Sequence, residues 1–414
     1  MADCCGGSKR RTSFEIQAIV ALHLVRNGCR VGRFAFRQST STLIPAQNDN
    51  RDRPCAGPVR EKIAMVLHRI VIVVSAFAVS ATALLAQSVS TDQGREIPAY
   101  ALPVPEDISP EMRPLVAAPP APWDIHPKSI AEWKELVTKV AAPAKTLLPA
   151  MREKLGVKLE QATIGGVNVF VLTPQTIAPE NQNRVFIHFH GGAYVLNPGE
   201  PGTREGTLMA GFGRAKVISV DYRTSSDAPY PAALDDSVAV YRELLKTVPP
   251  QRIAVFGTST GGALTMALVL RARQEGLPLP AAIAPGSPWS DMTKTGDTFY
   301  SHNLVDNFQV SYDGYLKDSA HLYASGRDLK DPMLSPIYGD LKGFPPTILI
   351  SGTRDLFLSL TVRTHRKLRR AGVEADLQVF EGLSHAQYTI NPDAPETREA
   401  FEEIARFFDR HMQR

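Results

Sequence analysis

The chain has 414 residues, of which 43% are hydrophobic and 21% are charged, so most of it can bury a large core and is neither disordered nor fibrous. Its formal net charge is +4, but the first 64 residues carry eleven Lys or Arg and five Asp or Glu, a net charge of +6. The chain from Met65 onward therefore carries a net charge of −2 and has no excess of positive charge with which to bind nucleic acid.

The cysteines are confined to the N-terminal part of the chain. Cys4, Cys5, Cys29 and Cys55 all precede Met65. The rest of the chain therefore relies on neither a disulfide framework nor a thiolate metal site.

An apolar segment begins shortly after Met65. The sequence Met-Val-Leu-His-Arg precedes an unbroken run of apolar or small residues at 70–85, and Ala86 follows, which is the order of a secretory signal peptide. We therefore predict that residues 65–86 are a signal peptide cleaved after Ala86, and that the mature protein is periplasmic or secreted.

The same segment has two other interpretations. If Met1 is the true start, residues 70–86 form a membrane anchor, and the positive charges before it still place the following domain outside the cytoplasm. The second alternative is a buried core helix, although the positive charges before the apolar run and the small residues after it favour export. The mature domain is expected at a membrane only if this anchor is retained. Residues 1–64 are interpreted as an over-extended start or a disordered tail without function.

The mature part is predicted to contain three regions. Prolines recur at residues 87–127, which prevents a long helix and indicates an extended linker or an arm lying on the surface. Residues 128–160 are assigned to amphipathic helices, the first of which begins at Ser129 with Glu132 three residues later. Residues 161–414 are expected to form one α/β domain with an insertion near 289–330.

Within this last region, short β-rich runs alternate with helical patterns. Strands are predicted at 167–172, 185–189, 217–220, 253–256, 281–283, 347–350 and 377–380. Helices are predicted at 232–246, 261–275, 359–371 and 396–411. The central strands are apolar on both faces, which predicts an α/β fold with a mostly parallel central sheet flanked by helices. No glycine-rich nucleotide motif follows any of these strands.

The strongest motif lies between the fourth predicted strand and the helix after it. The sequence Gly257-Thr258-Ser259-Thr260-Gly261 is a G-x-S-x-G pattern in a strand-to-helix context. Such a turn exposes a serine at the carboxyl edge of the sheet, next to a helix N-terminus that favours negative charge. Ser259 is therefore the candidate nucleophile, and a purely structural turn is the alternative.

A second glycine motif lies upstream. The buried strand at 185–189 runs into His190-Gly191-Gly192-Ala193. Adjacent glycines allow backbone N–H groups to turn toward a cavity, as an oxyanion hole requires. The N–H groups of Gly191, Gly192 and Thr260 are therefore the candidate donors, and His190 is expected to hold the loop.

A serine nucleophile needs a base, and the base needs an orienting carboxylate. Five histidines follow Ser259 in the sequence: His302, His321, His365, His385 and His411. We expect His365 and His411 to face solvent, whereas His302 and His321 fall in the polar insertion. His385 leaves the last predicted strand at the same sheet edge as Ser259, which makes it the candidate base.

The candidate acid is Asp355, which follows the strand at 347–350 on the same edge and gives the order Ser, Asp, His. Asp291 and Asp331 are the rival acids. Asp331 lies within Asp-Pro-Met-Leu-Ser-Pro, where it is better suited to fixing a loop.

Taken in order, these motifs resemble the hormone-sensitive-lipase-like esterases of the α/β-hydrolase fold, the bacterial family IV. The resembling segments are His190 to Ala193, Asp221-Tyr222-Arg223 with Pro229, Pro231 and Asp235, the Ser259 turn, Ser287-Pro288-Trp289 with Asp291, Asp331 to Pro336, Gly352 with Asp355, and His385. The resemblance implies a carboxylic-ester hydrolase whose triad is Ser259, Asp355 and His385. It also implies that the N-terminal helices cap an acyl pocket, and it is compatible with a homodimer.

The sequence departs from the family pattern near the nucleophile. The family often has Asp before the serine and Ala after it, whereas this chain has Thr258 and Thr260. Ala193 stands where the oxyanion loop usually has a further glycine. These changes leave the branch of the family and the shape of the pocket open.

The expected function is exported serine esterase activity on small or short-to-medium-chain carboxylic esters, through an acyl-enzyme. Neither half-reaction requires a metal ion or an organic cofactor, and none is predicted. The aromatic residues at 289–323 either line an acyl pocket or pack the insertion. Lactonase, deacetylase or amidase activity would use the same triad, and a non-catalytic ligand-binding protein on this fold is a further alternative.

Overall fold

A computed structural model describes residue 94 and residues 97–413 of the chain. The predictions for the signal peptide, the membrane anchor and the first 64 residues lie outside these described residues. The unit Ala99–Arg414 contains the fold described below.

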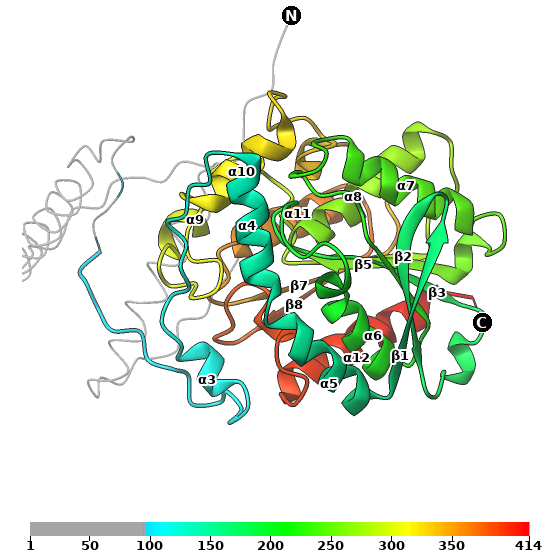
Figure 1. Cartoon of the computed structure of the whole chain (residues 1–414), viewed down its shortest axis with the longest axis horizontal. Helices are drawn as coiled ribbons and strands as arrows, with labels where there is room; N and C mark the ends of the chain where they lie inside the picture. Colours follow the sequence, from blue (N-terminus) through cyan, green and yellow to red (C-terminus); the bar gives the residue numbers. More distant parts are fainter. Residues whose placement is uncertain (1–93, 95–96, 414) are drawn as a thin grey trace, which may run out of the picture. The chain divides into compact units, whose positions relative to one another are not determined.

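The core of this unit is a sheet of eight strands in the order β1-β2-β4-β3-β5-β6-β7-β8 (Figure 1). The strands are β1 (Val157–Ile164), β2 (Val167–Pro174), β3 (Val185–Phe189), β4 (Val217–Val220), β5 (Ile253–Thr258), β6 (Ala282–Gly286), β7 (Thr347–Gly352) and β8 (Ala375–Phe380). The neighbours from β4 to β8 pair in parallel, and the β1–β2 and β2–β4 pairs are antiparallel. The mostly parallel sheet confirms the predicted fold class.

Helices cover both faces of the sheet. The helices in the described part of the chain are α3 (Arg113–Val116), α4 (Ile130–Ala141), α5 (Ala144–Leu155), α6 (Arg204–Gly213), α7 (Ala232–Leu244), α8 (Thr260–Gln274), α9 (Thr298–Ser301), α10 (Tyr315–Ala324), α11 (Leu358–Arg370) and α12 (Pro395–His411). Leucines and valines of α7, α8 and α11 join one buried cluster, whereas α6 and α12 belong to the cluster on the opposite face. None of the helices among the described residues is long and apolar enough to cross a membrane.

Strand β3 shows why these residues form a central strand. Phe186 packs edge-on against Phe408 of α12 at 5.0 Å between ring centroids, whereas Ile187 and Phe189 belong to the cluster on the other face. Alternate side chains of a strand point to opposite faces, so a strand that is apolar on both must be covered twice. This placement puts the carboxyl end of β3, and the loop that follows it, in the middle of the sheet edge.

Several elements differ from the sequence-based expectation, among them α9 and α10, which lie in the predicted insertion and were not predicted as helices. Residues 128–160 were assigned to helices, but α5 ends at Leu155 and β1 begins at Val157, inside that range. β1 is an edge strand whose residues are mostly exposed, so its hydrophobic alternation is weak. Helix α6 was not predicted, because its glycines and its lack of a capping side chain give no clear helical signal.

The described part of the proline-rich segment takes the form of an arm lying on the α/β domain. Ile108, Met112 and Val116 are buried in the cluster that contains α6 and α12. The N–H and hydroxyl of Ser109 both donate to Glu396 at the start of α12, at 2.9 and 2.7 Å. Apolar burial and these bonds hold the arm in place although its prolines prevent a long helix.

Candidate active site

Ser259 occupies a strained turn between β5 and α8. Its φ is 64° and its ψ is −121°, a conformation that costs a non-glycine residue on the order of 1–3 kcal/mol. The turn can form because residue 261 is glycine: a Cβ there would lie 1.9 Å from the carbonyl oxygen of Phe189. The serine is 8% exposed, at the carboxyl end of β5 and the N-terminus of α8.

The loop after β3 lies against this turn. A Cβ at Gly191 would lie 2.8 Å from the carbonyl oxygen of Thr258 and 3.2 Å from the Cβ of Ser259. In the described part of the chain, no loop or turn hydrogen bond uses the N–H groups of Gly191, Gly192 or Thr260. The structure therefore brings the predicted oxyanion donors and the candidate nucleophile to one place, and leaves those donors available.

His190 holds the oxyanion loop, as the sequence predicted for it. Its ring stacks on Tyr222 with 4.1 Å between centroids, and the Tyr222 hydroxyl donates to the His190 carbonyl at 2.7 Å. Nδ1 of His190 lies 2.9 Å from the Gly191 carbonyl oxygen. Burial lowers the pKa of His190 to about 4, so this imidazole is neutral near pH 7.

Asp355 and His385 form the second half of the site. Asp355 follows β7, His385 follows β8, and Nδ1 of His385 lies 3.0 Å from Oδ1 of Asp355. Both side chains are buried, with 2% or less of each exposed. The remaining capacity of the carboxylate is filled by the hydroxyls of Ser287 and Ser351 and by the N–H of Phe357. These three donors fix the acid, and Ser351 gave no signal in the sequence.

The charges of this pair stabilise each other. Burial opposes ionisation of Asp355, but His385, the Ser287 hydroxyl and the Phe357 N–H together lower the pKa of the carboxyl below its ordinary value. Burial also opposes the imidazolium, but two nearby carboxylates, Asp355 and Asp306, raise the pKa of His385 above its ordinary value. Such a His385 is suited to holding the proton that a serine gives up.

Aromatic side chains connect the two halves of the site. The ring of Phe357 packs 4.6 Å from the ring of His385 and 5.9 Å from that of Trp289. The backbone N–H of Trp289 in turn donates to the Ser259 carbonyl oxygen at 3.0 Å. The nucleophile turn and the Asp–His pair therefore belong to one packed unit at the carboxyl edge of the sheet.

Asp306, in the insertion between β6 and β7, was missed by the sequence analysis. It is fully buried, and its Oδ2 accepts the N–H groups of His385 and Leu356 at 3.0 and 2.7 Å. Its Oδ1 accepts the N–H groups of Phe308 and Gln309, each at 2.8 Å. No motif surrounds this residue, so only the fold reveals its closeness to His385.

A buried polar network lies beneath the nucleophile turn. Glu205 of α6 accepts the Thr258 N–H at 3.0 Å and the Thr258 hydroxyl at 2.7 Å. The Tyr388 hydroxyl lies 2.7 Å from Oγ1 of Thr258, and Nε2 of His188 lies 3.2 Å from Glu205. The threonine that departs from the family pattern is thus anchored by a glutamate that the sequence analysis did not select.

The other candidate residues lie outside this arrangement. Asp291 is paired with Arg363 at 2.8 Å, and Asp331 accepts the Met333 N–H at 2.9 Å, the loop-fixing role expected for it. His365 and His411 were expected to face solvent, but both are partly buried: Nε2 of His365 lies 3.1 Å from the Ala375 carbonyl oxygen, and His411 pairs with Glu374 at 3.3 Å. That expectation was wrong because neither the basic neighbours of His365 nor the closeness of His411 to the chain end fixes which face of a helix a side chain occupies.

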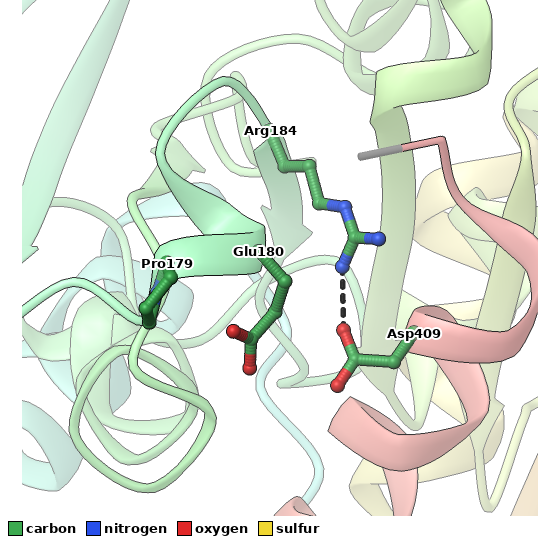
Figure 2. A pocket seen from close by; sticks show the side chains of 4 residues that line it. All are labelled: Pro179, Glu180, Arg184 and Asp409. Carbon is green, nitrogen blue, oxygen red and sulfur yellow. Dashed lines mark hydrogen bonds and ion pairs between the residues drawn. The ribbon is translucent and has the colours of Figure 1, made fainter.

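A surface hollow at the amino end of β3 offers no comparable chemistry. Figure 2 shows it lined by Pro179, Glu180, Arg184 and Asp409, with the Arg184 guanidinium directed at the Asp409 carboxylate. The guanidinium also donates to the carbonyl oxygens of Met412 and Gln413, each at 3.0 Å. Arg184 therefore fixes the C-terminus against β3. Among the described residues, no group of three or more His, Cys, Asp or Glu could hold a metal ion.

The comparisons with known proteins agree with this geometry. Residues 186–389 match the sequence profile of a family described as having the alpha/beta hydrolase fold. An acetyl-hydrolase of Streptomyces hygroscopicus is 30% identical over 243 residues, which cover 58% of this chain and 81% of that protein. An esterase of Acinetobacter venetianus is 29% identical over 231 residues, covering 56% of this chain and 76% of the relative.

Solved structures give the same result. The crystal structure of an esterase matches with a TM-score of 0.75 and 43% identity, covering 77% of this chain and 99% of that one. An esterase from the bacterial hormone-sensitive lipase family matches with a TM-score of 0.63 and 28% identity, covering 73% of this chain and 99% of the other.

Proposed function

The chain belongs to the hormone-sensitive-lipase-like family of the α/β-hydrolase fold, and we propose that it is a serine carboxylesterase that works through an acyl-enzyme on Ser259. One observation carries the proposal. The buried hydrogen bond between Asp355 and His385 lies at the same sheet edge as a serine held at positive φ beside two glycines. Nucleophile, base and orienting acid in this arrangement are the parts that acyl transfer requires.

The proposed reaction has two halves. His385 takes the proton of the Ser259 hydroxyl as its oxygen attacks the ester carbonyl, and the N–H groups of Gly191, Gly192 and Thr260 bind the oxyanion. The imidazolium then gives its proton to the leaving alcohol, which completes the acyl-enzyme. In the second half, His385 takes a proton from a water molecule as the water oxygen attacks the acyl carbonyl. The acyl–Ser259 bond then breaks, and the imidazolium returns its proton to the Ser259 oxygen as the carboxylic acid leaves. Asp355 keeps the imidazole oriented and stabilises its charge in both halves.

Short acyl groups are the proposed substrates. One relative is named an acetyl-hydrolase, and three aromatic residues of the insertion, Phe299, Tyr312 and Tyr323, are buried as packing residues. Tyr323 stacks on Tyr194 of the oxyanion loop with 3.7 Å between ring centroids. An aromatic wall packed this closely suits an acetyl or butyryl group better than a long chain.

The test is hydrolysis of p-nitrophenyl esters of increasing acyl length by the full chain, beside a Ser259→Ala variant. We expect turnover by the wild type to be greatest for acetate or butyrate and to fall by about a thousandfold or more in the variant. A Ser301→Ala change, at an exposed serine, controls for the loss of a hydroxyl elsewhere. An inactive wild type, or equal turnover by the Ser259→Ala variant, would reject the esterase mechanism.

Export is a further part of the proposal, supported by the order of charged, apolar and small residues at 65–86. Cell fractionation followed by N-terminal sequencing tests it. A periplasmic or secreted product that begins at Gln87 supports it, and a cytoplasmic product that keeps residues 65–86 contradicts it.

We also propose a homodimer. The strand β8 lies at the edge of the sheet, and Val379 on it is 41% exposed, so a second copy could pair there. Sedimentation velocity of the purified chain would show one dimeric species if this is correct and a monomer if it is not.

A further inference from the structure

Asp306 lies in the insertion but contacts both loops that carry the Asp–His pair. Through Oδ2 it accepts the N–H of His385 itself and that of Leu356, the residue after Asp355. Through Oδ1 it accepts two N–H groups of its own turn, from Phe308 and Gln309. One buried side chain thus joins the insertion, the acid loop and the histidine loop.

Burial and the neighbouring charge of Asp355 raise the pKa of this carboxyl above its ordinary value, and its backbone hydrogen bonds oppose that rise by favouring the charged form. Four N–H donors occupy its two oxygens, so a carboxyl proton would face donors instead of an acceptor. None of the ion pairs found among the described residues supplies Asp306 with an Arg or Lys partner. Backbone amides therefore hold a buried carboxylate beside His385. Burying a carboxylate without a cationic partner costs folding free energy, so its presence at this place points to a role in the site.

We propose that Asp306 is a positioning residue for the catalytic pair, which fixes the backbone of the acid and histidine loops and places a second negative charge beside the imidazole of His385. This inference rests on the proposed esterase function. It explains why the insertion folds back onto the catalytic loops, since its turn at Asp306 bonds to both.

The neighbouring residue links the same turn to the N-terminal arm. The Asn307 amide donates to the carbonyl oxygens of Leu115 and Ala118, each at 2.8 Å, and its own oxygen accepts from Gln387 at 2.8 Å. The Asn307 N–H donates to the Ser384 hydroxyl at 3.1 Å, next to His385. Asn307 therefore braces the turn without adding charge, which allows geometry and charge to be separated by experiment.

The electrostatic consequence has a definite sign. Among the described residues, Asp355 and Asp306 are the charged groups that act on the imidazole of His385, and both raise its pKa against the opposing effect of burial. Removal of the Asp306 charge therefore lowers the pKa of His385. Because the base must be neutral to accept the serine proton, the acid limb of kcat/KM should then move to lower pH.

The experiment compares pH profiles for p-nitrophenyl acetate hydrolysis by the full-length wild type, Asp306→Asn, Asn307→Ala and Asp313→Asn. An asparagine at 306 offers one acceptor oxygen and turns an NH₂ group toward two backbone donors, so the loops should loosen. We expect kcat to fall about 10- to 100-fold with KM nearly unchanged, and the acid limb to move down by about one pH unit. Asp313, an exposed residue of the same insertion paired with Lys294, is the matched control and should behave as wild type.

The outcomes separate this inference from the proposed function. If the wild type hydrolyses no ester, the proposed function fails. If the wild type is active and a folded Asp306→Asn variant keeps its kcat and its acid limb, the inference alone is overturned. If that variant does not fold, the Asn307→Ala variant decides. A kcat that is three- to tenfold lower, with the wild-type KM and the wild-type acid limb of the pH profile, supports the inference, and an unchanged kcat overturns it.

Discussion

The two ends of strand β3 are built on opposite principles. At the amino end, the Arg184 guanidinium is buried and bonded to Asn181, Asp409 and two C-terminal carbonyl oxygens. At the carboxyl end, the N–H groups of Gly191 and Gly192 enter no loop hydrogen bond of the described chain, and the residues after them, Ala193 and Tyr194, have φ values of 55° and 60°. One end satisfies its donors and the other keeps them free in a strained loop.

This difference separates stability from chemistry along a strand of five residues. Satisfied buried groups favour the folded state, whereas free donors and backbone strain cost stability and are kept where a transition state can use them. Substitutions at the two ends should therefore affect different measurements.

The largest expected effect is at the carboxyl end. A Gly191→Ala change would place a Cβ against Thr258 and Ser259, so the loop must move away from the nucleophile. We expect kcat to fall at least 100-fold, about 3 kcal/mol in the transition state, with a much smaller change in melting temperature. Gly276→Ala, where no atom lies within 4 Å of the added Cβ, should cost about 1 kcal/mol of stability and no activity. A Gly191→Ala variant with wild-type kcat would show that this loop does not bind the oxyanion.

The converse is expected at the amino end. Arg184→Ala removes the guanidinium and leaves two C-terminal carbonyl oxygens without their donor, so the free energy of unfolding should fall by about 3 kcal/mol. Folded molecules should keep the wild-type kcat, because Arg184 precedes the amino end of β3, whereas Ser259 follows the carboxyl end of β5, its parallel neighbour. Urea unfolding measures the first quantity and active-site-titrated kinetics the second.

An exposed arginine provides the control for that comparison. Arg242 pairs with Glu275 on the surface, where ion pairs contribute about 0–1 kcal/mol, so Arg242→Ala should leave the urea midpoint nearly unchanged. If Arg184→Ala lowered kcat as strongly as Gly191→Ala does, the two ends of β3 would not be separable.

The same contrast limits what the sequence could predict. Ser259, Gly191 and Gly192 lie in short motifs beside buried strands, and the strands at 185–189 and 217–220 were predicted with the observed bounds. Local periodicity and turn chemistry specify such elements directly. The pairing of His385 with Asp355 followed from the order of the strands, because parallel strands bring their carboxyl ends to one edge.

Residues whose partners are distant in the sequence could not be predicted. Asp306 bonds to backbone N–H groups of residues 356 and 385, and Glu205 bonds to Thr258 from a helix that the sequence did not reveal. A backbone N–H carries no side-chain signature, so no residue pattern marks the acceptor that binds it. The edge strand β1 was missed for a related reason. It pairs with one neighbouring strand only and most of its residues are exposed, so its sequence has little hydrophobic alternation.

A smaller effect is expected from pH, and it comes from His190. Its pKa is about 4 in the folded chain and 6.5 as the ordinary value, so below pH 6.5 the unfolded chain binds a proton that the folded chain does not. Stability should therefore fall as pH decreases, by about 2 kcal/mol between pH 7 and pH 5 from this residue alone.

Thermal unfolding of the wild type and of His190→Asn at the two pH values measures this contribution. The variant should lose less stability than the wild type over that interval, because it has no imidazole at this position to protonate on unfolding. If the wild type and the variant lost equal stability between the two pH values, His190 would not be the cause of the acid sensitivity.

The smallest effect is expected at the middle of the strand, where Glu205 touches both His188 of β3 and Thr258 before the nucleophile. Glu205→Gln replaces one acceptor oxygen by an NH₂ group that faces the donors of Thr258, so the turn should shift slightly. We expect kcat to fall about tenfold, or 1.4 kcal/mol, with KM unchanged, because the shifted turn misplaces Ser259 slightly whereas the substrate pocket stays in place. Glu200, whose side chain is 44% exposed and paired with Arg152, provides the control as Glu200→Gln. If the Glu205→Gln variant lost stability but kept its kcat, the role of Glu205 would be structural, like that of Arg184 at the amino end of β3. If it lost kcat at unchanged stability, Glu205 and the His188 that it contacts would belong with the catalytic residues at the carboxyl end.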